Sequence, residues 1–409
     1  MIARIAALTF IFGCTTVAWA ILGATIFART DASRAQLRGR VASTWGAPHE
    51  QAPPAAGYEL LAPRTVEGVE DGKKFKRTVE EKTVVPLPLE SSRLDVALDL
   101  AYRQKGLLWY SVYRVAFTGV YGFRNTSDQD QLVTFTLNFP AAQAIYDDLL
   151  LFVDGAPLPV TNQKTAASGA ARVAAGKTAM LKVSYRSKGL DTWRYNFGGE
   201  VAQVRDFTLN LHTNFKDIDF PDNTVSPTEK RETTDGWALA WSYKNLVSGF
   251  QIAVAMPEKL QPGPLAGRIS FFAPVSLFFF FFLMFIITTL REIELHPMNY
   301  FFLAAAFFSF HLLLAYLVDH ISIHAAFVIC SAVSIFLVVS YLRLVVGIRF
   351  AAVEAATAQL IYLVLFSYAF FFKGLTGLTV TIGSILTLFV VMQMTGRIRW
   401  AEKFARKPA

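Results

Sequence analysis

Three ionisable side chains, Asp319, His320 and His324, stand together in the stretch "VDHISIH" between two long apolar runs. The two histidines are four residues apart, so on a helix their imidazoles would share one face and could bind Zn²⁺. Such a site needs a third ligand, and the loop between the runs is short. The alternative is a water-exposed turn in which Asp319 lies near the start of the next helix, where a carboxylate is favoured. We expect the turn, without a metal or other cofactor.

A second candidate group lies inside an apolar run. His311 follows Tyr300 by about three helical turns, and Ala304 and Phe307 complete the stripe, so these side chains share one helix face. Ionisable groups within a membrane are costly and usually face other helices. His311 could form a proton relay with Glu354, near the start of a later apolar run. We favour a neutral histidine that hydrogen-bonds to another helix, because transporters normally carry several such groups.

The stretch "HPMNY" begins one of the apolar runs. Pro297 suits the first turn of a helix, and Tyr300 suits the membrane interface. His296 follows Glu292 and Glu294 closely in the sequence. We therefore expect His296 to cap the helix or to form a pair at its start.

The region from residue 58 to residue 267 carries no recognisable catalytic set. It holds no G-x-S-x-G or H-E-x-x-H motif, and both cysteines, Cys14 and Cys330, lie in apolar runs elsewhere. Several aromatic residues could line a groove for a sugar or peptide, but such residues more often form the core of a β-sandwich, which we expect here. They are Trp193, Tyr195, Trp237, Trp241 and Tyr243.

Six apolar runs are long enough to cross a membrane as helices. The first, residues 5–28, would span about 36 Å, whereas a cleavable signal peptide has an apolar core of roughly 7–15 residues. We therefore predict a retained anchor over residues 1–28. Five further runs predict a helical bundle over residues 268–396. They cover residues 269–290, 298–318, 325–342, 350–372 and 375–394.

The distribution of charge predicts how the chain is oriented. The net charge is +8, but residues 29–267 hold 28 Lys and Arg against 26 Asp and Glu. Because no basic patch stands out there, nucleic acid is a poor partner. The excess of Lys and Arg flanks the apolar runs and ends in the tail, residues 397–409. Cytoplasmic loops collect these residues, so we predict a basic cytoplasmic tail and an outer domain on the opposite side.

The outer region reads as many short strands. Leu94, Val96 and Leu98 alternate with Asp95 and Asp99, and other runs repeat this period of two. The pattern predicts an antiparallel β-sandwich over residues 58–267. Residues 29–57 read as a juxtamembrane helix and a linker rich in proline and glycine. The predicted fold is a six-helix membrane part, one helix N-terminal and five C-terminal, plus an all-β extracytoplasmic domain.

Three segments resemble inner-membrane proteins of the CreD family. They are "RAQLRGRVASTWG", "LPLESSRLDVALDLAYRQKGLLWYSVYRVAFTGVYGF" and "LHPMNYFFLAAAFFSFHLLLAYLVDHI". His296, Pro297, Tyr300 and His320 fall on matching positions, and Asp319 stands where an acidic residue is usual. The resemblance is weak between residues 141 and 257. It implies an anchor, a large periplasmic domain and a helical bundle in the bacterial inner membrane, and a link to envelope stress without an assigned chemical activity.

These observations predict a non-enzymatic membrane protein. Its partners would be the lipid bilayer and another envelope protein or envelope component that contacts the β-domain. A transporter of small solutes or protons is the first alternative, but only His311 and Glu354 indicate a polar path. An envelope-modifying enzyme is the second, and it would depend on Asp319, His320 and His324.

Overall fold

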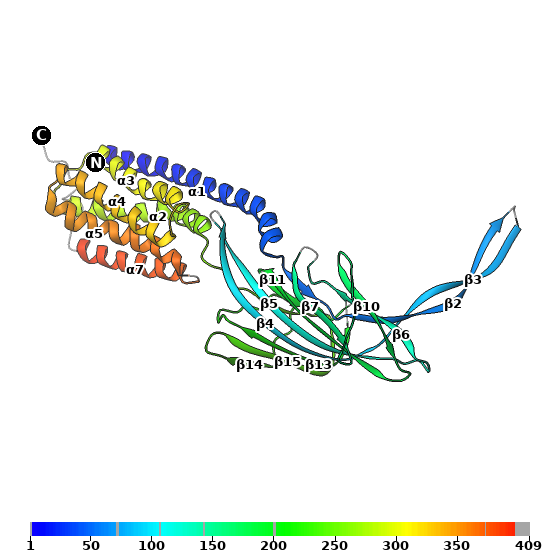
Figure 1. Ribbon diagram of the computed structural model, residues 1–409. Coiled ribbons are helices and arrows are strands. Elements are labelled where there is room, and N and C mark those ends of the chain that lie inside the picture. Colours follow the sequence, from blue (N-terminus) through cyan, green and yellow to red (C-terminus); the bar gives the residue numbers. More distant parts are fainter. Residues whose placement is uncertain are drawn as a thin grey trace. The chain divides into compact units, whose positions relative to one another are not determined.

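The computed structural model describes residues 2–70, 73–105, 108–141, 144–198, 202–372 and 374–396. The predicted basic tail lies outside these residues. The chain divides into two compact units (Figure 1). The membrane unit comprises residues 1–36, 104–108 and 260–409, and the β unit comprises residues 37–103 and 109–259. The β unit therefore begins earlier and ends earlier than the predicted outer domain, residues 58–267.

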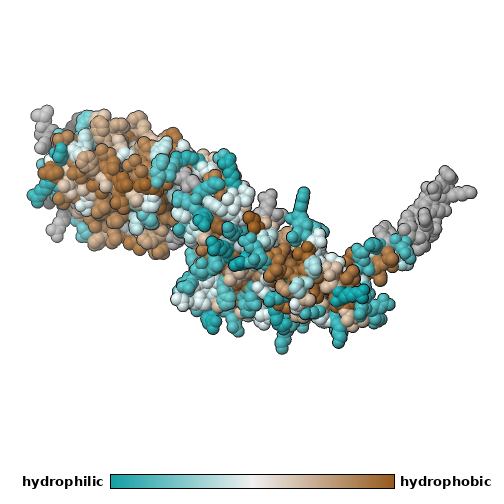
Figure 2. All heavy atoms as spheres, viewed as in Figure 1, coloured by the Kyte–Doolittle hydropathy of each residue, from teal (hydrophilic) through white to brown (hydrophobic). Residues whose placement is uncertain are grey.

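The six predicted membrane spans are confirmed as six apolar helices within the described residues. Apolar side chains cover much of the visible surface of the membrane unit, whereas the β unit is mostly polar on this face (Figure 2). Burial of that apolar surface in lipid is what holds such helices in a bilayer. The helices are α1 (Ile2–Trp45), α2 (Pro262–Leu290), α3 (Pro297–Leu317), α4 (Ile323–Val345), the fifth span (Phe350–Phe371) and α7 (Thr376–Thr395).

The fifth span is irregular. Two π-helical segments, η1 (Phe350–Ala355) and η2 (Leu360–Leu365), enclose the short α5 (Ala356–Gln359). The span ends in α6 (Phe366–Tyr368) and a 3₁₀ turn, η3 (Ala369–Phe371). Widened π turns inside a helix are rare and often mark functional positions.

Helix α2 begins before the predicted span because small residues let it pack closely on α1. Gly263 and Gly267 are one helical turn apart, and both are buried. A Cβ on Gly267 would lie 2.7 Å from the Phe27 ring, and a Cβ on Gly263 would overlap the Thr30 side chain. Small residues spaced in this way allow close backbone approach between membrane helices. The helix thus starts at Pro262, in the region that the sequence predicts as the end of the β-domain.

The β unit contains sixteen strands within the described residues. The first eight are β1 (His49–Gln51), β2 (Ala55–Glu70), β3 (Lys73–Pro86), β4 (Leu89–Lys105), β5 (Leu108–Arg124), β6 (Gln131–Asn138), β7 (Tyr146–Val153) and β8 (Ala156–Pro157). The second eight are β9 (Thr161–Asn162), β10 (Ala166–Val173), β11 (Thr178–Leu190), β12 (Thr192–Tyr195), β13 (Ala202–Thr213), β14 (Glu229–Glu232), β15 (Trp237–Ser248) and β16 (Ile252–Ala255).

Within the described residues these strands form three sheets. Their orders are β14-β15-β13-β4-β5-β11-β7-β8, β3-β2-β6-β10-β9 and β1-β12-β16. Most neighbours are antiparallel, as predicted, but β13 runs parallel to β4 and β1 runs parallel to β12. The parallel pairs arise because strands distant in the sequence meet, which a local pattern does not reveal.

The predicted alternation along the strands is confirmed. Leu94, Val96 and Leu98 are buried, whereas Asp95 and Asp99 are exposed. The predicted linker is only partly a linker: β1 lies within it, and β2 begins at Ala55. Three residues are too short a strand for a period of two to be recognised. Helix α1 also continues to Trp45, as the predicted juxtamembrane helix requires.

Candidate functional site

Asp319 binds α1 rather than the start of α4. One of its carboxylate oxygens lies 3.2 Å from an Arg29 guanidinium nitrogen, and Arg29 also donates a 2.6 Å hydrogen bond to the Ala315 carbonyl. The expectation that Asp319 favours the start of the next helix is not met, because Ser322 caps α4 and accepts from the Ala325 N–H. The Arg29–Asp319 pair ties the two helices together.

The two histidines of this turn do not converge on a common ligand set. His320 is exposed, and the ring of His324 lies against Phe371 with 5.0 Å between ring centroids. Across the part of the chain that the structure describes, no group of three His, Cys, Asp or Glu side chains is arranged to hold a metal ion. A zinc ligand set built on His320 and His324 would therefore lack a third protein ligand among the described residues.

His311 lies on the predicted stripe, and the whole stripe is buried. Tyr300, Ala304, Phe307 and His311 are each at most 1% exposed. The His311 Nδ1 lies 3.0 Å from the Phe307 carbonyl oxygen, which can only accept, so Nδ1 donates this hydrogen bond. The Trp19 ring of α1 packs edge-on at 5.4 Å. His311 thus faces the bundle, but its hydrogen bond is made inside its own helix and not, as expected, to another helix.

Glu354 pairs with Arg291 and not with His311, its partner in the alternative of a proton relay. Its carboxylate lies 2.5 Å from the Arg291 guanidinium, at the end of α2. Arg291 is close in sequence to Pro297, the first residue of α3, whereas His311 lies about 20 Å further along that helix at 1.5 Å per residue. The structure does not bring His311 and Glu354 together.

Removing Arg291 should cost more stability than neutralising Glu354. The Glu354 side chain is only 15% exposed and that of Arg291 is 54% exposed. Arg291→Ala leaves a largely buried carboxylate without its cation, and we expect a loss of about 1–3 kcal/mol. Glu354→Gln leaves a cation that water can solvate and should cost clearly less. Unfolding of the purified protein in detergent, with Arg343→Ala as the exposed control, measures both. Equal losses would contradict this account of the pair.

His296 and Tyr300 serve the start of α3. The His296 Nδ1 accepts a 3.2 Å hydrogen bond from the Met298 N–H, which confirms the expected cap. Tyr300 was expected at the interface, but its side chain is fully buried. Its ring packs edge-on against Phe281, and its hydroxyl lies 3.5 Å from that of Thr288. Its amphipathic ring is therefore used to join α2 and α3.

A buried chain of hydrogen bonds that the sequence did not predict joins three helices. The Gln359 amide donates to the Ser334 hydroxyl at 2.7 Å, and Ser334 donates to the Ala306 carbonyl at 2.6 Å. Gln359 is fully buried and lies between the two π-helical segments. In the sequence, Ser334 and Gln359 are isolated polar residues within apolar runs, which is the pattern that could have predicted these hydrogen bonds. Hydrogen bonds of this kind join helices where lipid offers no partner.

The aromatic residues of the β unit mainly form its core, as expected. Trp193, Tyr195 and Trp241 are at most 1% exposed. Trp237 and Tyr243 are only partly buried at the edge of this core.

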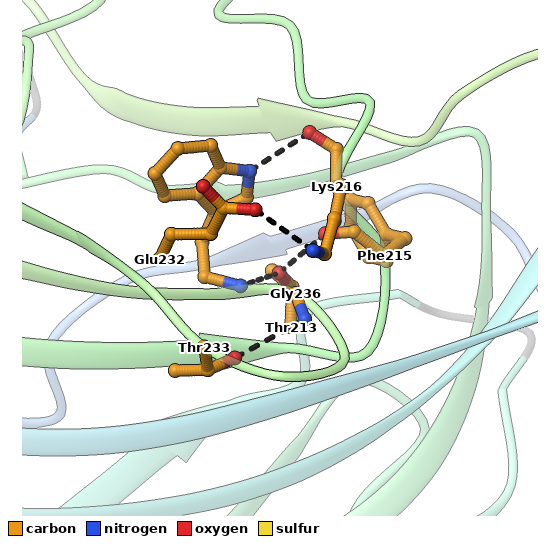
Figure 3. Close-up of polar contacts among 7 residues, drawn as sticks. Thr213, Phe215, Lys216, Glu232, Thr233 and Gly236 are labelled. Carbon is orange, nitrogen blue, oxygen red and sulfur yellow. Dashed lines mark hydrogen bonds and ion pairs between the residues drawn. The ribbon is translucent and has the colours of Figure 1, made fainter.

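A polar brace holds the turn that precedes Trp237. The Trp237 indole donates to the Lys216 carbonyl at 2.8 Å, while the Lys216 ammonium pairs with Glu232 at 2.8 Å. The Thr213 hydroxyl donates to the Phe215 carbonyl and accepts from the Trp237 N–H, and Figure 3 shows these contacts beside the Lys216–Glu232 pair. These contacts occupy the polar groups around Trp237, so the residue serves the fold rather than an open groove.

His49 is a buried titratable group of the β unit. The sequence places it in a linker, but the structure buries it to 1% exposure among tyrosines. Its ring stacks on Tyr146 and meets Tyr113 edge-on. Burial lowers the pKa of His49 to about 4, and only the nearby Lys188 backbone opposes the shift. Two residues on, Gln51 accepts a 2.7 Å hydrogen bond from the buried Tyr185 hydroxyl.

Among the described residues, most of these polar groups form ion pairs and hydrogen bonds that join helices or hold turns in place. In the membrane unit the Arg29–Asp319 and Arg291–Glu354 pairs join helices. In the β unit the rings of Tyr113 and Tyr146 lie against His49. A neutral buried imidazole can nevertheless respond to protons, because gaining a charge in such a place is costly.

The comparisons with known proteins point to one family. Residues 251–401 match the family described as "Inner membrane protein CreD". The matched span contains the segment "LHPMNYFFLAAAFFSFHLLLAYLVDHI", so the resemblance predicted from it is confirmed. The other two resembling segments, residues 34–46 and 87–123, lie outside the matched span. None of the curated proteins matches this chain.

Solved structures give only distant similarity. A candidate nutrient-binding protein from Legionella pneumophila is 9% identical, with a TM-score of 0.32, over 57% of this chain and 76% of its own. An M1 zinc metallopeptidase from Deinococcus radiodurans is 10% identical, with a TM-score of 0.25, over 41% of this chain and 42% of its own. An aminopeptidase N family protein from Idiomarina loihiensis reaches a TM-score of 0.19 at 10% identity, over 46% and 36%. The chain thus spans less than half of either peptidase, and these TM-scores do not establish a shared fold.

The family match covers β16 and every helix of the C-terminal bundle, and the six apolar helices agree with it. Over residues 251–401, this chain is similar to the family of the inner membrane protein CreD.

Proposed function

We propose that this protein is a non-enzymatic inner-membrane factor that maintains envelope integrity through contacts of its β unit in the periplasm. The partner would be another envelope protein. The observation that carries the proposal is the arm formed by β2 and β3, which we call the β2–β3 arm.

The β2–β3 arm leaves its sheet after three residue pairs. Strand β2 pairs with β6 only from Ala55 to Gly57, whereas its pairing with β3 continues from Gly57↔Pro86 to Glu70↔Lys73. Beyond Gly57 the arm has no third strand among the described residues, and it runs beyond the other strands (Figure 1). Thirteen further pairs correspond to about 40 Å of ribbon.

A ribbon of this kind favours a partner. An isolated pair of strands is marginally stable in water, and its edges leave backbone N–H and C=O groups unpaired. Leu60, Leu61 and Val84, at its base, are each about half exposed or more. A second protein that adds a strand or covers these side chains would satisfy both the edges and the apolar surface.

Shortening the β2–β3 arm tests the proposal. Replacing residues 60–83 by Asn-Gly keeps the pairs next to Gly57 and closes them with a favourable hairpin turn. We expect normal membrane levels and an unchanged unfolding transition of the β unit, but loss of tolerance to envelope-targeting agents and of cross-links from the arm. The control replaces the exposed turn Asp154–Gly155 by Gly-Gly and should keep both. Unchanged tolerance in the shortened variant would refute a role for the arm.

The proposed orientation is tested separately. A reporter that is active only outside the cytoplasm should be silent when fused after Ala409, and active when inserted at the exposed turn Asp154–Gly155. The reason is the surplus of Lys and Arg on one side of the spans. An active fusion after Ala409 would reverse the orientation.

A further inference from the structure

A cavity of about 510 Å³ lies within the β unit, beneath the end of α1. The last residues of α1 and the following Gly46, residues 43–46, form one wall. Strands β5 and β11, with the segment that enters β7, form the others. Ligand sites of small molecules commonly have volumes of roughly 300–1,000 Å³.

The walls are held in place by backbone contacts. Gly46 closes α1 by donating to the Ala42 carbonyl, and its φ of +111° sends the chain back across β11. The Leu190 N–H then donates to the Ala47 carbonyl at 3.2 Å. On the other side the Ser187 hydroxyl donates to the Ile145 carbonyl at 2.7 Å. The cavity is therefore formed before any ligand arrives.

Two cations stand directly opposite each other on the floor of this cavity. Arg114 of β5 and Lys188 of β11 are register partners, and both are exposed on the same face of the sheet. Like charges at opposite positions destabilise a sheet. The neighbouring Arg186 is paired with Asp148, but no ion pair or side-chain hydrogen bond is made by Arg114 or Lys188 among the described residues.

The rest of the lining offers acceptors and a small apolar surface. Asp99 and Asp147 line the cavity as exposed carboxylates. The Ser43 and Thr44 hydroxyls donate to the Arg40 carbonyl, so their oxygens remain acceptors for a ligand. Trp45 adds an aromatic surface.

We propose that this cavity binds a small molecule with a phosphate or carboxylate group, held by Arg114 and Lys188, and an ammonium or hydroxyl group near Asp99 and Asp147. An oxyanion between the two cations would turn their repulsion into two charge-assisted hydrogen bonds. The site goes beyond the proposed function and does not depend on the β2–β3 arm.

A structural role for the cations gives the opposite expectation. If Arg114 and Lys188 served to neutralise the C-terminal end of α1, removing either charge would destabilise the protein. If they hold a ligand, removing one relieves repulsion and stabilises the ligand-free protein. The sign of the stability change therefore separates the two roles.

The test uses the full chain in detergent and inorganic phosphate as the probe, at constant ionic strength with chloride as reference. Phosphate should raise the unfolding temperature of the β unit in the wild type. Lys188→Gln should raise that temperature in chloride and weaken phosphate binding by at least about tenfold. Arg114→Gln should behave alike. Lys182→Gln, on the same face of β11 but outside the cavity, should leave phosphate binding unchanged.

Two further probes identify the chemistry of the ligand. Acetate tests a carboxylate, and phosphoethanolamine adds an ammonium group to the phosphate. Phosphoethanolamine should bind more tightly than phosphate, and Asp147→Asn should remove that difference alone. The proposal is overturned if none of the three probes stabilises the wild type, if Lys182→Gln and Lys188→Gln weaken binding equally, or if Lys188→Gln destabilises the protein in chloride.

Discussion

Acidification from about pH 7 to about pH 4 should lower the free energy of unfolding of the β unit by about 3 kcal/mol through His49 alone. His49 is 1% exposed, so its ring is almost completely shielded from water. The rings of Tyr113 and Tyr146 surround it. A charged imidazole would lose its hydration there without gaining a carboxylate.

The direction of the effect follows from the pKa. In the unfolded chain His49 titrates near 6.5, and in the folded protein burial lowers its pKa to about 4. Between these values the unfolded state binds more protons, so stability falls as the pH falls. The contribution of His49 to the free energy of unfolding is fully present above the pKa of the unfolded state, and it is lost below the pKa of the folded state. Half-buried Asp191 acts in the opposite direction, because partial burial raises its pKa.

His49→Phe isolates the contribution of His49. Phenylalanine keeps an aromatic ring against Tyr113 and Tyr146 but cannot take up a proton. Denaturant unfolding of the full chain, followed at several pH values, should show a slope in the wild type that exceeds the slope in the variant between about pH 6.5 and about pH 4. Because other groups titrate in both proteins, the difference between the slopes is the quantity that counts. Identical slopes would mean that His49 titrates normally.

Gly46→Ala should destabilise the β unit by about 3 kcal/mol or more. Gly46 has a φ of +111°, which side chains other than glycine rarely adopt, and a Cβ there would overlap the Lys188 carbonyl. Backbone strain of this kind costs about 1–3 kcal/mol, and overpacking against a fixed backbone adds a similar amount. The displaced segment leads directly into β1, so the parallel pairing of His49 with Trp193 should weaken as well.

Gly39→Ala is the matched control for this substitution. Gly39 lies in α1, and a Cβ there would meet nothing within 4 Å. Alanine is a better helix former than glycine, so this change should stabilise α1 by about 0.5–1 kcal/mol. The two variants, compared by thermal unfolding in the same detergent, should therefore shift in opposite directions. A small effect of Gly46→Ala would mean that the end of α1 is free to move away from β11.

The sequence by itself was sufficient for the spans and for most of the strands. A run of about 20 apolar residues, and a period of two such as that from Leu94 to Leu98, are properties of neighbouring residues. The same holds for the cap at His296, whose partner is two residues away. Features of this kind depend on backbone geometry that repeats along the chain, so they can be read without knowing what lies beside them.

Only the tertiary structure decided which polar groups meet. Arg29 binds Asp319, which is 290 residues away in the sequence. Gln359 binds Ser334, 25 residues away. Arg114 lies opposite Lys188, 74 residues away. Burial of His49 likewise depends on a parallel pairing of a three-residue strand with β12. Register and helix rotation fix such contacts, and both result from packing over the whole unit. The sequence therefore determined which residues could carry charge, whereas packing decided which of those charges are paired, buried or left facing a cavity.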